Sequence, residues 1–90
     1  MRFEYDHAKD ARNIPAHGVS LAHAEHLAWD AALVWLDERF HYDELRMVGL
    51  VPAGDRLFCV AFVDRCCVRR VISLRPATRR EVKHYVEACP

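Results

Sequence analysis

The sequence LFCVAFV, residues 57–63, is the longest uninterrupted apolar run in the chain. Its length is typical of one buried strand, and consecutive apolar side chains need cover on both faces of a sheet. We therefore expect a central strand with helices packed over it. Further strands are predicted at 31–36, 46–51 and 67–74, separated by a polar loop at 37–44 and turns at 52–55 and 64–66. Short strands joined by short turns are typical of an antiparallel meander.

The segment before these strands is predicted to hold one short strand and two helices. Residues 3–5 alternate as an edge strand does, and a first helix is expected to begin directly afterwards. Pro15 disfavours helical geometry at the residue before it, so this helix is expected to stop there. Residues 15–19 then form a connector, and a second helix is expected over residues 21–29.

The last element is predicted to be a C-terminal helix. Thr78 and Glu81 have the spacing of a capping box, in which each side chain accepts a hydrogen bond from an otherwise unpaired backbone amide. An apolar stripe follows at helical spacing, formed by Val82, Tyr85, Val86 and Cys89. With 90 residues, the chain has enough apolar surface for about one core, so residues 1–90 are expected to be a single α+β domain.

Composition excludes several classes of protein. An apolar fraction of 52% argues against disorder, while 29% charged residues and a mean hydropathy of −0.15 argue against a membrane protein. The start of the chain turns acidic at once and lacks the apolar stretch of a secretory signal, so we expect a cytoplasmic protein. The four cysteines lack the spacing of a disulfide framework or a zinc site and are interpreted as small apolar or incidental residues.

The net charge of zero conceals an asymmetry between the two halves of the chain. Residues 1–45 carry nine acidic and four basic side chains, whereas residues 46–90 carry four acidic and nine basic ones. The segment 65–83 holds seven basic residues against the single acid Glu81. Such a segment indicates either a polyanionic partner or a solvated face, and charge by itself does not separate the two.

Two arginines directly follow the cap of the C-terminal helix. Arg79 and Arg80 face the positive end of the helix dipole, an arrangement that a bound phosphate would stabilise. Arg75, at the end of the preceding strand, is expected to converge on the same place. The alternative is that both helical arginines extend into water, where the dipole is screened.

Other residues are candidates for proton transfer, each with a structural alternative. Glu81 suits a general base, but the capping box already accounts for it. The Tyr85 hydroxyl suits a proton donor or an ordinary structural hydrogen bond. His17, in the predicted connector, suits proton transfer or a hydrogen bond at a helix end. His23 and His26 have the spacing of a metal pair on a helix, but no third ligand accompanies them, so solvent exposure is expected.

The chain also resembles the BrnT toxins in segments from both ends and the centre. The matching residues are Phe3-Glu4-Tyr5-Asp6, Lys9, Asn13, His17-Gly18-Val19-Ser20, Arg46 with Gly49, Arg70-Val71-Ile72-Ser73-Leu74-Arg75, Ala77-Thr78-Arg79-Arg80-Glu81 and Tyr85. The chain departs from the usual pattern at Tyr5, His7, Ala16 and Leu74, where the family has Trp, Pro, Lys and Ala. The loss of the lysine at position 16 removes one cation from the predicted site.

This resemblance implies a RelE-like ribonuclease that arrests translation, is neutralised by a BrnA-type antitoxin and binds operator DNA through that complex. It implies cleavage without a metal or other cofactor, with the 2′-hydroxyl of the RNA as nucleophile. Arg75 and Arg79 would bind the scissile phosphate, and His17 or Tyr85 would transfer protons. The RNA backbone would be bound by Lys9, Arg46, Arg70, Arg80 and Lys83. The alternative is a catalytically inactive basic module that acts only through binding of the antitoxin or operator DNA.

Overall fold

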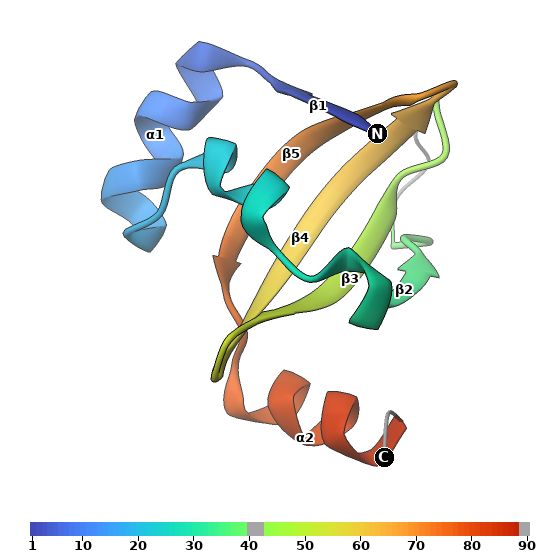
Figure 1. Cartoon of the computed structure of the whole chain (residues 1–90). Coiled ribbons are helices and arrows are strands. Elements are labelled where there is room, and N and C mark those ends of the chain that lie inside the picture. Colours follow the sequence, from blue (N-terminus) through green and yellow to red (C-terminus); the bar gives the residue numbers. More distant parts are fainter. Residues whose placement is uncertain (40–42, 89–90) are drawn as a thin grey trace.

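The computed structural model describes residues 1–39 and 43–88. Its strands form one five-stranded sheet in the order β1-β5-β4-β3-β2 (Figure 1). They are β1 (Arg2–Tyr5), β2 (Leu33–Leu36), β3 (Met47–Ala53), β4 (Arg56–Arg65) and β5 (Val68–Pro76). The helices are α1 (His7–His17), the 3₁₀ helices η1 (Leu21–His26) and η2 (Trp29–Ala31), and α2 (Arg79–Ala88). The α+β class is confirmed, and β4 is the central strand of the sheet as predicted.

The sheet is mixed, so it is not the simple antiparallel meander that was expected. Strands β2, β3, β4 and β5 pair antiparallel with their neighbours. Strand β1 instead pairs parallel with β5, with Arg2 opposite Val68 and Tyr5 opposite Val71. The chain between them crosses the whole sheet before β5 forms, a long-range pairing that strand patterns along the sequence do not reveal.

Strand β3 continues past its predicted end. Pro52 and Ala53 still pair with β4, so the turn contains only Gly54 and Asp55 instead of residues 52–55. Gly54 has a φ of 62°, a left-handed conformation that glycine adopts without strain. The predicted loop 37–44 includes residues outside the described part of the chain, as does the stripe position Cys89.

Helix α1 is longer than predicted, because it runs through Pro15 to His17 before Gly18 ends it in a left-handed conformation. Its last turns are anchored to the sheet by Asn13, a buried residue whose amide nitrogen donates to the backbone carbonyl of Leu74 at 2.8 Å. This tertiary contact offsets the local cost of a proline inside a helix. The expected stop at Pro15 is therefore wrong.

The second predicted helix, over residues 21–29, is replaced by the two short 3₁₀ helices η1 and η2. Between them the chain bonds to other groups: the Ala28 amide donates to the Pro52 carbonyl at 2.8 Å. The indole nitrogen of Trp29 donates to the carbonyl of Ala24, also at 2.8 Å. These bonds hold the backbone outside regular α-helical geometry while η1 still buries its apolar side chains.

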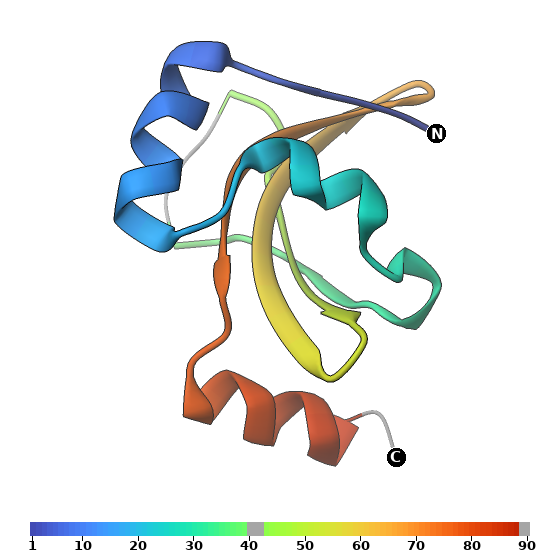
Figure 2. The same ribbon diagram turned by 60° about the vertical axis from the view of Figure 1, so that its left-hand side comes forward.

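The main core lies between the 3₁₀ helices and one face of the sheet (Figure 1). Its buried members are Leu21, Ala24, Leu27, Val51, Phe58, Val60, Phe62, Val71 and Leu74. Side chains alternate along a strand, so the intervening residues of β4 face the other side. There a smaller cluster of Val48, Leu50 and Cys59 packs against α2. We call this second face the open face, because α2, the helix that packs on it, lies near one end of the sheet (Figure 2).

A bulge in β5 decides which arginines reach the open face. The register with β4 shifts between Ala61 and Phe62, which leaves Ile72 as an extra residue on β5. Arg70 and Arg75 are five positions apart, so strict alternation would put them on opposite faces. The bulge brings both to the open face.

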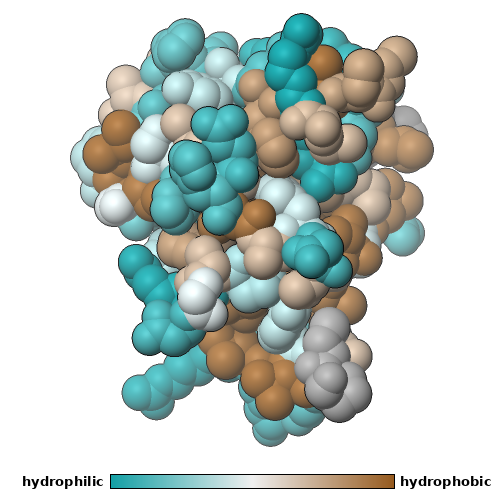
Figure 3. Space-filling model, viewed as in Figure 1, coloured by the Kyte–Doolittle hydropathy of each residue, from teal (hydrophilic) through white to brown (hydrophobic). Residues whose placement is uncertain are grey.

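Helix α2 is attached to the sheet by Tyr85, which packs against the smaller cluster and donates its hydroxyl to the Ala31 carbonyl at 2.6 Å. The remaining stripe residues are less covered: Val82 and Val86 are exposed, and Figure 3 shows hydrophobic side chains gathered over this end of the molecule. Among the described residues, no helix has the length and apolar character needed to span a bilayer.

Candidate functional site

A cleft of about 480 Å³ opens on the open face of the sheet. A row of direct register partners crosses it, from Trp35 through Val48 and Ala61 to Ser73. Because Ala61 and Ser73 have short side chains, the surface is hollow between Trp35 on β2 and Arg75 on β5. The other residues that line the cleft are Leu36, Asp37, Glu38, Arg39, Cys59 and Glu81.

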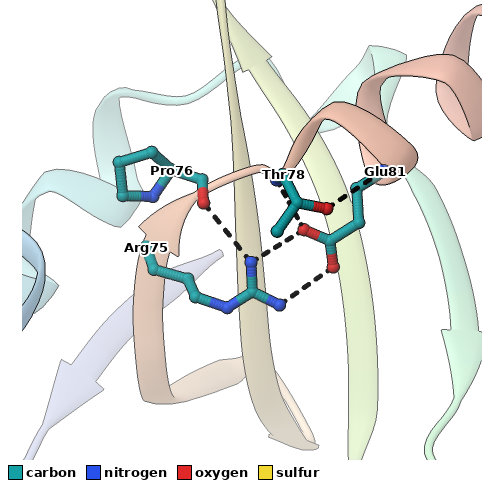
Figure 4. Close-up of polar contacts among 4 residues, drawn as sticks. All are labelled: Arg75, Pro76, Thr78 and Glu81. Carbon is teal, nitrogen blue, oxygen red and sulfur yellow. Dashed lines mark hydrogen bonds and ion pairs between the residues drawn. The ribbon is translucent and has the colours of Figure 1, made fainter.

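Arg75 and Glu81 form a bidentate ion pair at one side of the cleft (Figure 4). The two guanidinium Nη atoms donate to the two carboxylate oxygens at 2.7 and 2.9 Å. Glu81 Oε1 also accepts from the Thr78 amide at 2.9 Å, while Thr78 Oγ1 accepts from the Glu81 amide at 3.2 Å. The predicted capping box is confirmed, and the same carboxylate holds the arginine that was predicted to bind phosphate.

These contacts change the acidity of both partners. The Arg75 guanidinium, and secondarily the Thr78 amide, lower the pKa of Glu81 to about 2 against the cost of partial burial. Glu81 in turn raises the pKa of Arg75. Beside them, burial raises the pKa of the Cys59 thiol to about 11. Arg75 and Glu81 are thus both charged at neutral pH, and Cys59 is a neutral thiol.

A second ion pair lies at another wall of the cleft. Asp37 follows β2 and is buried, with 2% of its side chain exposed. Arg39 donates to its two carboxylate oxygens at 2.9 and 3.0 Å, while its own side chain is 72% exposed. The described residues therefore line the cleft with three carboxylates and two guanidinium groups, and both guanidinium groups are held by carboxylates.

A second hollow of about 360 Å³ lies further along the open face, around Arg46, Arg65 and Arg70. Two of these arginines, Arg65 and Arg70, lie beside carboxylates. Arg65 forms a bidentate pair with Glu44, which lowers the pKa of that carboxyl, and Arg70 lies 3.2 Å from Glu4. Two of the residues predicted to bind RNA, Arg46 and Arg70, are therefore brought together here.

The predicted convergence of Arg75 with Arg79 and Arg80 is met only in part. Arg75 does reach the first turn of α2, but it binds Glu81 there. Arg79, Arg80 and Lys83 are exposed on α2, and no ion pair joins them to other described residues. The side chains of the helix start therefore form an exposed basic patch, which we call the α2 patch (Arg79, Arg80, Lys83), outside the cleft lining.

The remaining predicted site residues are spread over the molecule. His17 is exposed in the last turn of α1, and Lys9 is exposed in its first turn. The hydroxyl of Tyr85 is donated to Ala31. Of the four residues predicted to be catalytic, all of which are described, Arg75 is the one that lines the cleft.

One cation of the basic segment, Arg69, does not face the open side of the sheet. It lies on the helix-covered face, where its guanidinium stacks over Trp29 at 4.4 Å and Phe62 at 4.3 Å from the ring centroids. It also donates to both Asp64 oxygens at 2.7 and 2.8 Å. Only 16% of the side chain is exposed, so Arg69 packs against the aromatic residues of this face and is largely withheld from solvent.

Of the histidine pair on η1, His26 is exposed as expected, whereas His23 is half-buried. His23 packs edge-on against Phe58 at 5.5 Å, and His26 is exposed beside Glu25. Across residues 1–39 and 43–88, no group of three or more His, Cys, Asp or Glu side chains is arranged to hold a metal ion.

Several residues of the cleft were not predicted from the sequence to belong to a site. Trp35 was predicted only as part of a strand, and Asp37 and Arg39 only as part of a polar loop. Ser73 belongs to a segment quoted for the family resemblance, but it had no assigned role. Alternation on the predicted strands would have put Trp35 and Leu33 on one face, yet nothing in the sequence showed which short side chains lay opposite them.

A family model described as the ribonuclease toxin, BrnT, of a type II toxin–antitoxin system matches residues 5–81 of the chain. A comparison with curated proteins gave no match. The matched range includes β2 to β5 and the last residue of β1, and it ends at Glu81, the residue that holds Arg75.

Proposed function

From the premise that this chain belongs to the BrnT family of ribonuclease toxins of type II toxin–antitoxin systems, we propose that it cuts RNA bound along the open face of its sheet. The observation that carries the proposal is the position of Arg75, Arg70 and Arg46 on this face, beside two hollows that α1, η1 and η2 leave uncovered. Their guanidinium groups suit phosphates spaced along one strand of RNA.

The proposed chemistry is attack by the 2′-hydroxyl oxygen on the adjacent phosphorus. The bond from phosphorus to the 5′-oxygen breaks, which leaves a 2′,3′-cyclic phosphate and a 5′-hydroxyl. Arg75 and Arg79 are proposed to stabilise the added negative charge on the phosphate oxygens. If the phosphate is to accept from both Nη atoms of Arg75, it has to take the place of the Glu81 carboxylate, which accepts from both of them in this structure.

Proton transfer is assigned to His17 or Tyr85. A base must take the 2′-hydroxyl proton, and an acid must protonate the departing 5′-oxygen. The exposure of His17 leaves its imidazole accessible to RNA. Tyr85 would first have to give up its 2.6 Å bond to Ala31, so His17 is the better-supported of the two.

A metal-independent mechanism is supported by the ion pairs of the cleft, because a carboxylate that holds an arginine is not available to bind a metal ion. Of the three carboxylates that the described residues contribute to the cleft, Asp37 and Glu81 already hold arginines. The remaining partners are proposed from family membership: a BrnA-type antitoxin, and operator DNA bound by the complex. Action on translation in the cytoplasm belongs to the same proposal.

The rival function is a binding module without catalysis. The observation that favours it is the Arg75–Glu81 pair, because a neutralised arginine contributes little to phosphate stabilisation unless RNA displaces its partner. The BrnT family usually has a lysine where this chain has Ala16, and the loss of this cation also favours a binding module over a catalyst.

Expression of the chain without an antitoxin should arrest growth of a bacterial host and shorten the half-life of its messenger RNA. The purified chain should cut RNA in excess EDTA. Arg75→Ala should slow cleavage by about 100-fold or more, because the charge of the transition state loses its main stabilising group. Arg12→Ala, an exposed arginine on α1, should leave the rate unchanged.

Normal growth with unchanged messenger RNA would contradict the proposed function. Cleavage that stops in EDTA and returns with magnesium would contradict the metal-independent mechanism only.

A further inference from the structure

The cleft is a shallow chamber with one aromatic wall. Trp35 stands at the β2 end of the row that leads through Val48 and Ala61 to Ser73. Three strand spacings of about 4.8 Å separate the row's ends, so the indole and Ser73 lie roughly 14 Å apart. A volume of about 480 Å³ is within the range of small-molecule sites.

The indole of Trp35 is held in place from the side of α2. Its ring lies at 83° to the imidazole of His84, with the centroids 6.0 Å apart. Trp35 still has 38% of its surface exposed, although it is one of the largest apolar side chains in the molecule. An exposed, oriented aromatic ring at the wall of a cleft is the usual platform on which a nucleobase stacks.

On the β2 side of the cleft, the charges suit a base better than a phosphate. Arg75 and Arg39 are each held by a carboxylate through two hydrogen bonds. The third carboxylate, Glu38, is exposed, and no ion pair joins it to any residue in the described part of the chain. Among the described residues that line the cleft, carboxylates therefore outnumber guanidinium groups by one, and this extra negative charge on the β2 side attracts N–H donors.

We propose that this cleft binds one unstacked nucleobase of the RNA, with Trp35 as the stacking platform and Glu38 as the acceptor that reads its edge. Guanine is the base that fits, because its N1–H and N2–H₂ groups present adjacent donors to the two oxygens of a carboxylate. The scissile phosphate would then lie at the Arg75 side of the cleft, and the other phosphates of the strand would follow the second hollow and the α2 patch.

This inference rests on the proposed function for its RNA substrate, but base binding is measured without cleavage. Guanosine, adenosine, cytidine and uridine are titrated separately into the full ¹⁵N-labelled chain, and amide and indole N–H shifts are followed by NMR. We expect guanosine to shift the Trp35 indole signal and to bind most tightly. The Trp29 indole, which donates to Ala24 on the covered face, is the internal control and should not move.

Variants separate the stacking and edge contributions. Trp35→Ala should weaken guanosine binding about tenfold or more, while Trp35→Phe should retain most of the affinity. Val34→Ala, on the same strand, should leave it unchanged, because Val34 faces Gly49 on the other side of the sheet. Glu38→Gln should remove the preference for guanosine over adenosine, a loss of about tenfold, without altering the fold.

Two further probes distinguish a base from a phosphate. Guanosine 5′-monophosphate should bind no tighter than guanosine, and inorganic phosphate should not compete. Competition by phosphate, an unchanged affinity in Trp35→Ala, or equal binding of all four nucleosides would overturn the proposal. Guanosine binding by a chain that cuts no RNA would support this site while contradicting the proposed function.

Discussion

The Arg75 guanidinium and the Glu81 carboxylate join the local structure of α2 to the chemistry of the cleft. Glu81 satisfies the Thr78 amide at the start of the helix and, with both oxygens, orients the arginine. An anion is therefore already present where a phosphate was expected. A substrate phosphate that accepts from both Nη atoms of Arg75 must replace the carboxylate, and the helix start loses one of its two capping bonds when Glu81 moves away.

Glu81→Gln separates the ion pair from the cap, because glutamine can also accept in a capping box. We expect a loss of about 1 kcal/mol in the free energy of unfolding at neutral pH, small because the pair is partly exposed. The pKa of Glu81 is lowered to about 2 from an ordinary value of 4.5, so the ionised carboxylate stabilises the fold above about pH 4.5. This contribution is lost as the pH falls from 4.5 toward 2.

Urea unfolding of the wild type and Glu81→Gln over this pH range measures the effect, and the difference between them should shrink as the pH falls. Glu87→Gln removes the same charge from the same helix and serves as the control. A difference between wild type and Glu81→Gln that stays constant with pH would show that folding does not lower the pKa of Glu81.

Helix α1 illustrates how a tertiary contact overrides a local preference. Pro15 lies inside the helix, which nevertheless continues to His17. Asn13 holds it from one turn earlier, donating to the carbonyls of Val19 and Leu74 at 2.8 Å and accepting from the Leu74 amide at 3.4 Å. One buried amide thus joins the helix, the connector after it and β5.

Asn13→Ala should lower the free energy of unfolding by about 2–4 kcal/mol, because three backbone groups lose a partner in a buried place. Asn13→Asp should cost at least as much, since a carboxylate offers no donor to the two carbonyls and adds a buried charge. Arg12→Ala, at the exposed neighbouring position, should change stability by less than about 0.5 kcal/mol. Chemical unfolding measures all three, and a mild effect of Asn13→Ala would mean that the helix is held by its other contacts.

Taken as one molecule, the chain pairs part of its basic segment with its own carboxylates. The basic second half and the acidic first half meet in the pairs Arg70–Glu4 and Arg65–Glu44. Two further pairs, Arg69–Asp64 and Arg75–Glu81, form within the second half. Among the described residues, the α2 patch is the part of the basic segment that remains exposed without an ion pair.

We therefore expect association with an acidic antitoxin surface to depend on the α2 patch. The association rate should fall by about tenfold or more between low and high salt, since exposed charges steer encounter and salt screens them. Replacing Arg79, Arg80 and Lys83 together by glutamine should flatten this dependence. Replacing Arg2, Arg12 and Arg56, which are exposed elsewhere, should leave it steep. Stopped-flow measurements across a salt series would decide, and equal slopes for the two triple variants would contradict the assignment.

Sequence by itself determined the elements whose signals are local. The apolar run 57–63 marked the central strand, because its side chains need cover on both faces. Thr78 and Glu81 marked the start of α2, because a capping box requires only four residues. The segments that resemble BrnT toxins are likewise patterns along the chain, and the family match confirms the ribonuclease toxin assignment that they imply.

The tertiary structure decided everything that depends on residues far apart in the chain. The parallel pairing of β1, the persistence of α1 through Pro15 and the ion pairs between the two halves all arise from long-range contacts. The bulge at Ile72 put Arg70 and Arg75 on one face although their spacing predicts opposite faces. The row from Trp35 to Ser73 formed only when four strands came into register, because a cleft is made by neighbours across a sheet and not by neighbours along a chain.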